Sequence, residues 1–390
     1  MIKKMNITII IILLMTILTG CWDNRSLTDL GLVLAMGIDK KGDSYEVSYQ
    51  VVKPGTIKGK QGGGSGQEQA YWTYTSSGET VFDAVRNALK TTNKKLYLNY
   101  TQIVVIGESL AREGIKDVLD FLERDPEFGR DSYMIVVKGG EAKEIIDAES
   151  NQEDIPAMHI SNILENNRVL GKMKDVAIID VYKKMNKEYS ELIVGKIEKI
   201  NSEKEKLTIK DLKVEGSAVF IKDKLVGWLG VEETRGLLFI ENKINNTLLV
   251  VQNPIKENKK VSIEIKKSET KININFKDKK PVFVIEVNAR GNIAGQQGKG
   301  DLTEDRTLKK LQGKIKEEIK SEIKSAINKS MNVYNSDFLD FSGVINRKDF
   351  TQWNKLKEKW DSIFPDIEVR VEVKFNIIQS GLIRERTMVR

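Results

Sequence analysis

The chain has 390 residues, with 63 Lys and Arg, 56 Asp and Glu, and a formal net charge of +7. A hydrophobic content of 40% excludes a wholly disordered protein, and the length fits two or three domains of about 100–200 residues each. The single cysteine, Cys21, and the single histidine, His159, exclude an intramolecular disulfide, a cysteine zinc cluster and a two-histidine metal site.

The N-terminus has the layout of a secretory signal. Lys3 and Lys4 precede an apolar run over positions 7–18, which is shorter than the roughly 20 residues that a membrane-spanning helix needs. The run ends in Leu18-Thr19-Gly20-Cys21, which resembles a bacterial lipobox. Small residues give the signal peptidase access, and the Cys21 thiol accepts a diacylglyceryl group as a thioether. The sequence therefore predicts removal of residues 1–20 and a membrane anchor at Cys21, S-diacylglycerylated and N-acylated, for example with palmitate. The alternative is an uncleaved signal anchor with a chance cysteine at its end.

The first part of the mature chain predicts strands that alternate with helices. Two apolar segments flank the turn-like cluster Lys40-Lys41-Gly42-Asp43 and indicate a β-hairpin. Further short apolar runs indicate buried strands. The expected strands are 29–39, 45–52, 71–75, 102–106 and 133–137. This alternation favours a mixed sheet covered by helices.

Helices are expected between these strands. Ser76 and Glu79 have the spacing of a capping box, which predicts a helix directly behind them. Its expected apolar face consists of Phe82, Val85 and Leu89. Ser109 is expected to cap a second helical region that Gly114 breaks or bends. The apolar stripe of that region consists of Leu110, Ile115, Val118, Leu119 and Leu122. A short helix is expected over 141–148.

Two stretches of this half carry little structural signal. Positions 59–66 are rich in glycine, but Gln67 stands where a dinucleotide fingerprint needs its last glycine, and no Lys-Ser or Lys-Thr pair follows as in a P-loop. This stretch is therefore predicted to be a surface loop. Residues 151–210 are mostly polar, with an amphipathic piece at 176–182. They are predicted to be a connecting region, with the first domain ending near residue 195.

The second half predicts another α+β unit. A hairpin is expected over 212–221 and 225–228, followed by a helix at 231–240. Three strands are expected next, at 261–265, 272–276 and 282–287. Their alternation of apolar and polar residues indicates an antiparallel sheet with one face in water.

A long amphipathic helix is expected to start near Asp301, which stands with Glu304 at capping-box spacing. Its apolar positions recur every three or four residues, which favours packing across a sheet over a coiled coil. They are Leu308, Leu311, Ile315, Ile319, Ile323, Ile327, Met331 and Tyr334. A short helix with Trp353, Leu356 and Trp360 and a strand over 367–377 complete the chain.

The predicted fold class is therefore α+β, in several domains, with mixed or antiparallel sheets covered by helices. The expected divisions are the signal peptide 1–20, an N-terminal domain 21–195, a connecting hairpin and helix 196–255, and a C-terminal domain 256–390.

No catalytic motif appears in the sequence. There is no Gly-x-Ser-x-Gly elbow and no His-Glu-x-x-His, and His159 is predicted to be a surface or capping residue. Abundant Asp and Glu leave a two-carboxylate hydrolase open, without indicating a pair. Trp228, Trp353 and Trp360 are expected in the core. Charges of mixed sign without interleaved aromatic residues give no nucleic-acid pattern. We expect no enzyme, no metal site and no cofactor beyond the covalent lipid.

Several segments, in this order, resemble the Ger(x)C family, the lipoprotein C subunits of spore germinant receptors. They are Gly20-Cys21-Trp22-Asp23, Met36-Gly37-Ile38-Asp39, Thr75-Ser76-Ser77-Gly78, Ile106-Gly107-Glu108-Ser109-Leu110-Ala111, Arg124-Asp125-Pro126-Glu127, Gly216-Ser217-Ala218-Val219-Phe220, Lys224-Leu225-Val226-Gly227-Trp228, Ser336-Asp337, Trp353, Trp360 and Phe364. The chain departs from the family at Tyr100, where a histidine is common, and at Asn292-Ile293-Ala294-Gly295, where an acidic residue is common.

The resemblance implies a non-enzymatic protein with a multi-domain α+β fold, anchored by lipid on the outer face of the spore inner membrane. It implies integral membrane A and B subunits as partners in a complex that responds to nutrients such as amino acids, sugars or nucleosides. On this reading the chain acts as a tethered scaffold. The alternative is a solute-binding lipoprotein that itself holds the germinant; no residue pattern in the sequence assigns the germinant or ligand-binding residues.

Overall fold

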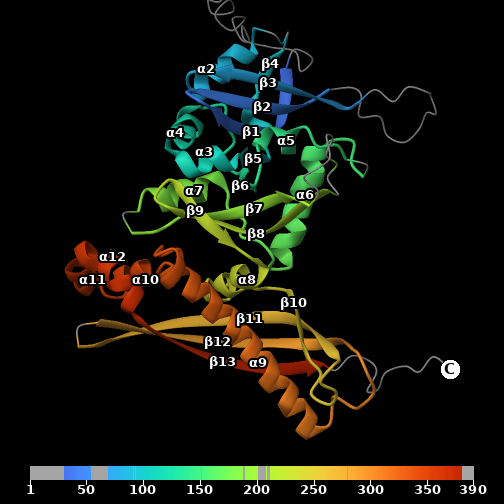
Figure 1. Ribbon diagram of the computed structural model, residues 1–390, viewed down its shortest axis with the longest axis vertical. Coiled ribbons are helices and arrows are strands. Elements are labelled where there is room, and N and C mark those ends of the chain that lie inside the picture. The colour runs from blue at the N-terminus through green and yellow to red at the C-terminus, as the bar shows by residue number, and fades with distance from the viewer. Residues whose placement is uncertain are drawn as a thin grey trace, which may run out of the picture.

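The computed structural model describes residues 30–53, 69–90, 92, 94–150, 152–187, 189–200, 208, 211–278 and 280–379. Two sheets lie one above the other along the long axis of the molecule (Figure 1). The first has nine strands in the order β3-β2-β1-β5-β6-β7-β8-β9, with β4 beside β1. The second has four strands in the order β10-β11-β12-β13. The predicted α+β class is confirmed.

The chain enters the first sheet through the predicted hairpin. β1 (Leu30–Lys41) and β2 (Ser44–Val52) pair antiparallel around Gly42, whose φ of +61° suits a residue without a Cβ. β3 (Tyr71–Gly78) pairs with β2 and forms one edge of the sheet. Because β3 extends past the expected end at 75, Ser76 lies within a strand, and the capping role predicted for it is wrong. The glycine-rich stretch 59–66 falls outside the described residues.

The centre of the first sheet is parallel. It contains β4 (Lys95–Tyr97), β5 (Ile103–Ile106), β6 (Tyr133–Lys138) and β7 (Ile193–Lys199). β5 is apolar throughout because helices cover both of its faces. One face carries α2 (Val81–Ala88), α3 (Glu108–Glu113), α4 (Lys116–Arg124) and α7 (Ile178–Met185), and the other carries α5 (Ala142–Ile146) and α6 (Pro156–Val169).

The expected apolar stripe of the α3–α4 region is buried as predicted. Gly114, with a φ of +139°, separates the two helices. The residue at the N-cap position of α3 is Gly107, however, so the capping role predicted for Ser109 is wrong.

The polar segment 151–210 holds more structure than expected. It contains α6, α7 and β7, and the description of the whole segment as a connection is wrong. α6 escaped prediction because it buries a narrow line of side chains, among them Ala157, Ile160 and Leu164. β7 crosses position 195, and β8 and β9 continue the same sheet. The domain boundaries stay a prediction, and this sheet joins residues on both sides of 195.

The middle of the chain matches its prediction closely. β8 (Leu212–Ile221) and β9 (Lys224–Leu229) form the expected hairpin, and α8 spans Val231–Ile240 as predicted. β10 (Thr247–Gln252), which was not predicted, opens the second sheet.

The second sheet is built from longer strands than expected. β11 (Lys260–Lys277) is one strand where two were predicted, and it pairs antiparallel with β12 (Lys280–Gln296). A register shift between Ile265 and Lys267 moves the buried side chains from odd to even positions, which made one strand look like two. β13 (Glu368–Gln379) then pairs parallel with β12.

A long helix covers the inner face of the second sheet. α9 (Asp305–Asn328) continues into the π-helical turn η4 (Lys329–Val333) and buries Leu311, Ile315, Ile319 and Ile323, as its apolar stripe predicted. It begins after Glu304, and Asp301 instead accepts hydrogen bonds from Thr303, so the predicted capping box is wrong. Short helices close the fold. They are η2 (Leu98–Tyr100), α10 (Phe341–Lys348), α11 (Phe350–Leu356), η5 (Lys357–Lys359), α12 (Trp360–Ile363) and η6 (Phe364–Asp366).

One apolar core joins the two sheets. Ile193, Val219 and Leu229 from the first sheet belong to the same buried cluster as α8, α9 and the inner face of the second sheet. Trp353 and Trp360 are buried in this cluster, as expected, and Trp228 is partly buried.

Candidate functional site

A cavity of about 800 Å³ opens at the end of the molecule that carries α2. Its walls come from α2, from α4, from residues 95–98 and from the loop 125–127. Two of the segments that carry the family resemblance meet here, namely the helix behind Thr75-Ser76-Ser77-Gly78 and the loop Arg124-Asp125-Pro126-Glu127. This cavity is therefore the candidate binding site among the described residues.

The register of α2 determines which side chains face the cavity. Gly78 allows a close approach, because a Cβ there would lie 2.3 Å from the backbone nitrogen of Ala84. Thr80 caps the helix by accepting a hydrogen bond from the Asp83 N–H at 3.1 Å. The buried face of α2 consists of Val81, Ala84 and Ala88. The apolar face expected for this helix, Phe82, Val85 and Leu89, lines the cavity, and Phe82 and Leu89 are 48% and 42% exposed.

Aromatic and aliphatic groups form the apolar part of the cavity. The Phe82 ring lies 6.3 Å from the Phe121 ring of α4, at an interplanar angle of 50°. The guanidinium of Arg86 lies 4.8 Å from the centroid of the Phe82 ring, a cation–π contact. Val85 and Leu89 complete this wall. The site thus offers an apolar surface with a cation at its edge.

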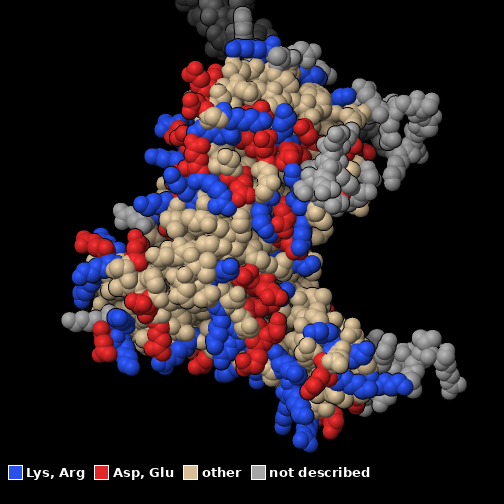
Figure 2. Space-filling model, viewed as in Figure 1, with Lys and Arg blue, Asp and Glu red and all other residues tan. Residues whose placement is uncertain are grey.

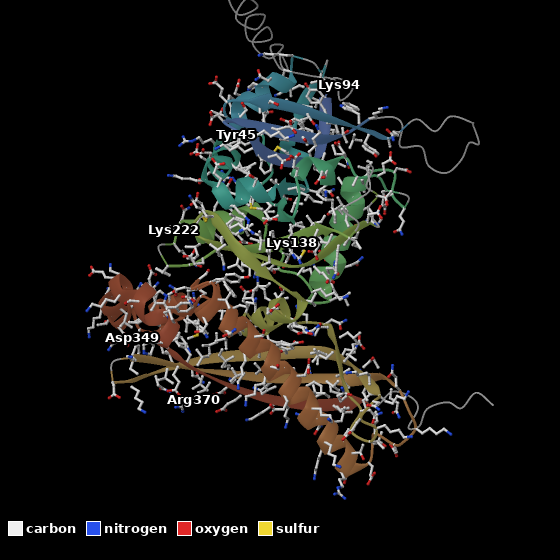
Figure 3. All side chains as sticks on the ribbon, viewed as in Figure 1. Tyr45, Lys94, Lys138, Lys222, Asp349 and Arg370 are labelled. Atoms are coloured by element: carbon white, nitrogen blue, oxygen red, sulfur yellow. The ribbon has the colours of Figure 1, made fainter. Side chains whose placement is uncertain are left out.

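Charged pairs border the cavity. Lys95 pairs with Glu127 at 2.5 Å, and Arg124 donates to both oxygens of Asp120 at 2.9 Å. The hydroxyl of Tyr45, labelled in Figure 3, donates to Asp117 at 2.8 Å. Burial raises the pKa of Tyr45 to about 12, and the neighbouring carboxylate of Asp117 adds to the effect. The cavity therefore combines an apolar wall with a charged border, which is suited to binding an amphipathic group.

The predicted anchor, Cys21, lies outside the described residues and stays a prediction. The first described strand begins at Leu30, nine residues after Cys21 in the sequence. Of the helices that the structure describes, none is long and apolar enough to cross a bilayer. Within the same described ranges, no group of three or more His, Cys, Asp and Glu side chains is placed to hold a metal ion.

His159 has a structural contact. Its Nδ1 lies 2.7 Å from the hydroxyl of Ser150, and that hydroxyl also accepts hydrogen bonds from the backbone N–H groups of Gln152 and Glu153. The pair therefore links the turn before α6 to the first part of that helix; His159 lies within α6 and does not cap it, because the N-cap residue is Ile155.

Comparison with known families assigns the chain. The family model described as the spore germination protein N-terminal domain matches residues 23–199, and the one described as spore germination B3/GerAC like, C-terminal, matches residues 215–381. The chain belongs to this GerAC family of spore germination proteins. The expected family is thereby confirmed, and membership supports a role in spore germination.

Relatives of the GerAC family match the chain along its length. Spore germination protein KC of Bacillus subtilis (strain 168) is 28% identical, with 98% of this chain and 97% of that protein covered. Spore germination protein B3 of the same strain is 25% identical, with 94% and 95% covered. A crystal structure of the GerBC protein is 22% identical and covers 88% of this chain and 96% of its own, with a TM-score of 0.57. It shows that the fold is shared.

Several segments that carry the GerAC resemblance have structural roles. Asp39, at the end of Met36-Gly37-Ile38-Asp39, accepts hydrogen bonds from the N–H groups of Ala142 and Lys143 at 2.8 and 2.9 Å. It thereby caps the N-terminus of α5 from the end of β1. A Cβ on Gly107 would lie 1.9 Å from the Asp39 carboxylate, so Gly107 leaves the space that this carboxylate fills.

The later GerAC segments link β9 to the end of η4 and order the start of α10. The Tyr334 hydroxyl donates to the Trp228 carbonyl at 2.9 Å and accepts from its N–H at 3.0 Å. A Cβ on Gly227 would lie 2.1 Å from the Tyr334 ring. Asp337 accepts hydrogen bonds from the N–H groups of Phe341 and Ser342 and from the Trp360 indole. Burial raises the pKa of Asp337 to about 7, against the effect of these donors.

The positions that depart from the GerAC pattern differ in exposure. Tyr100 is 56% exposed, and its ring lies 5.7 Å from that of Tyr97. Asn292 lies in β12, opposite Glu264 of β11. Neither position contributes to the cavity lining.

Sequence reasoning missed the cavity because its walls come from separate segments. The sequence does contain a usable signal for α2. The spacing of Thr80 and Asp83 indicates an N-cap. The small residues Ala84 and Ala88, four positions apart, indicate the face that packs closely.

Proposed function

We propose that this chain is a non-enzymatic, lipid-anchored subunit of a nutrient germinant receptor, held by acylated Cys21 on the outer face of the spore inner membrane. Integral membrane A and B subunits are its proposed partners, and its role is that of a tethered scaffold. The observation that supports this is the position of the family match, which begins at residue 23, directly behind the lipobox-like Leu18-Thr19-Gly20-Cys21.

The tether would be short. A fully extended chain advances at most about 3.3–3.6 Å per residue, so the nine steps from Cys21 to Leu30 reach roughly 30 Å. Confinement to a thin layer above the bilayer raises the effective concentration of the body near membrane-embedded partners. Partner contacts then need only modest affinity.

Replacing Cys21 with alanine is expected to move the protein from the membrane fraction to the soluble fraction and to slow germination. Two or more acyl chains hold a protein stably, and this substitution removes the atom that carries the diacylglyceryl group. Spore membrane fractionation, mass spectrometry and germination rates measure the outcome. Thr16→Ala, within the apolar run, is the control and should retain both properties. Full membrane retention in Cys21→Ala spores would contradict the proposal.

The cavity favours a second candidate, a lipoprotein that binds the germinant itself. If this is correct, a nutrient should raise the melting temperature saturably in the purified protein. Val85→Trp, which fills the cavity, should abolish that rise, whereas Val333→Trp, at an exposed position of η4, should not. A panel of amino acids, sugars and nucleosides that produces no shift favours the scaffold.

A further inference from the structure

The side of α2 that lines the cavity and is open to solvent combines apolar and basic side chains. Phe82, Arg86 and the C-cap residue Leu89 recur at four- and three-residue spacing, so they share one side of the helix, and Lys90 follows in the turn behind it. All four are exposed. An exposed side of this composition is typical of a helix that lies in a lipid headgroup layer.

More basic residues stand at strand ends of the same sheet. Lys53 follows β2, while Lys94 and Lys95 lie at the start of β4. Lys94 is labelled at the top of the molecule in Figure 3, and Lys and Arg side chains border this end in Figure 2. We call the group Lys53, Phe82, Arg86, Leu89, Lys90, Lys94 and Lys95 the basic end. Lys95 is paired with Glu127, Lys94 lies over the Trp72 ring and Arg86 lies over the Phe82 ring.

The chain register places the basic end next to the proposed tether. Leu30, the first described residue, pairs with Lys95 where β1 and β4 run parallel. Cys21 precedes Leu30 by nine residues, which limits its distance from this strand pair to roughly 30 Å. If Cys21 carries lipid, the basic end is therefore held near the bilayer, while the second sheet lies at the opposite end of the molecule (Figure 1).

We propose that the basic end rests on the anionic phospholipid surface of the membrane, with Phe82 and Leu89 in the headgroup layer and the Lys and Arg side chains against phosphates. This inference rests on the proposed anchoring at Cys21 and adds an orientation to it. Each basic residue near an anionic leaflet is attracted to it, and several together favour one orientation of a tethered body. The second sheet is then directed away from the bilayer.

A fluorescent probe at position 89 tests the orientation in the full, lipidated chain. Acylation occupies the Cys21 sulfur, so Leu89→Cys supplies the one reactive thiol for the probe. The protein is reconstituted in vesicles of phosphatidylcholine and phosphatidylglycerol that contain brominated lipid. We expect quenching at position 89 to exceed several-fold that at Phe350→Cys, the control, because Phe350 is 64% exposed on α11 in the other half.

Charge reversal tests whether electrostatic attraction to anionic lipid holds the basic end at the membrane. Lys90→Glu with Lys94→Glu should reduce quenching at position 89 at least two-fold, as should omission of phosphatidylglycerol. Lys355→Glu with Lys359→Glu, on exposed positions of α11 and η5, should leave it unchanged. Equal quenching at positions 89 and 350, with the protein still bound to vesicles, overturns the orientation but not the anchor. Protein that stays in solution overturns the anchor. Quenching that appears only after membrane subunits are added assigns the surface to a protein partner and also overturns the proposal.

Discussion

Replacing Arg235 with methionine is expected to destabilise the protein by about 3–5 kcal/mol at neutral pH, because it leaves a buried carboxylate without its partner. Arg235 on α8 holds Glu322 on α9 through two hydrogen bonds, with Nε at 2.8 Å from one carboxylate oxygen and Nη2 bonded to the other. The Glu322 side chain is 2% exposed. The helices approach closely here, since a Cβ on Gly236 would lie 2.2 Å from the Glu322 carbonyl oxygen.

The loss should grow with pH. Burial raises the pKa of Glu322 above its ordinary value, and Arg235 opposes that rise. Without Arg235, the pKa of Glu322 in the folded state rises further. Between the ordinary pKa of a glutamate and this raised value, Glu322 is then protonated in the folded protein but ionised in the unfolded chain. Stability therefore falls as pH increases through that window. The deficit of Arg235→Met relative to the natural chain should be smaller at pH 5 than at pH 8.

Denaturant unfolding at both pH values measures this effect. Arg370→Met is the matched control, because its pair with Glu368 is exposed on both sides and should contribute at most about 1 kcal/mol. Adding Glu322→Leu to Arg235→Met should recover most of the stability, since an apolar pair often replaces a buried ion pair without loss. If Arg235→Met is no less stable than Arg370→Met, the ion pair between Arg235 and Glu322 is not buried as described.

Replacing Gly107 with alanine is the second large effect that we expect, a loss of roughly 3 kcal/mol. The new Cβ would occupy the position of the Asp39 carboxylate, 1.9 Å away. Displacing that carboxylate leaves the N–H groups of Ala142 and Lys143 without their acceptor, and each unsatisfied buried group costs about 1–3 kcal/mol. Hydrogen exchange should show the start of α5 opening first.

The control is a glycine-to-alanine substitution at Gly313. Gly313 lies within α9, and a Cβ there would meet nothing within 4 Å. Gly313→Ala should therefore stabilise the protein by about 0.5–1 kcal/mol, the difference in helix propensity. Gly107→Ala should add little to the loss in an Asp39→Ala background, because the clash is then absent. Additive losses would refute the role of the carboxylate.

Local sequence patterns predicted the elements whose side chains follow one period without interruption. The hairpins around Gly42 and Lys222 and the stripe of α9 were found because each repeats every two or every three to four residues. β11 was divided in two because one extra residue near Lys266 reverses which side chains point inward.

Local sequence patterns could not predict the candidate site. On α2 the pattern placed Phe82, Val85 and Leu89 on one apolar face, without showing that this face lines a cavity. The structure buries the smaller Ala84 and Ala88, because Gly78 brings the helix backbone against the end of β3. That choice depends on a tertiary contact. The cavity, which brings together residues 95–98 and 125–127, depends on the topology of the whole first sheet.

The uninterrupted apolar core between the sheets has a mechanical consequence. Separating the halves would expose Val219 and Leu229 together with the side chains of α8 and α9 that pack on them, at roughly 25 cal/mol for each Å² of apolar surface. The two sheets are therefore expected to move as one rigid body and not as two flexibly linked domains. A rotation imposed at α2 then displaces the second sheet most, because that sheet lies at the opposite end of the molecule (Figure 1).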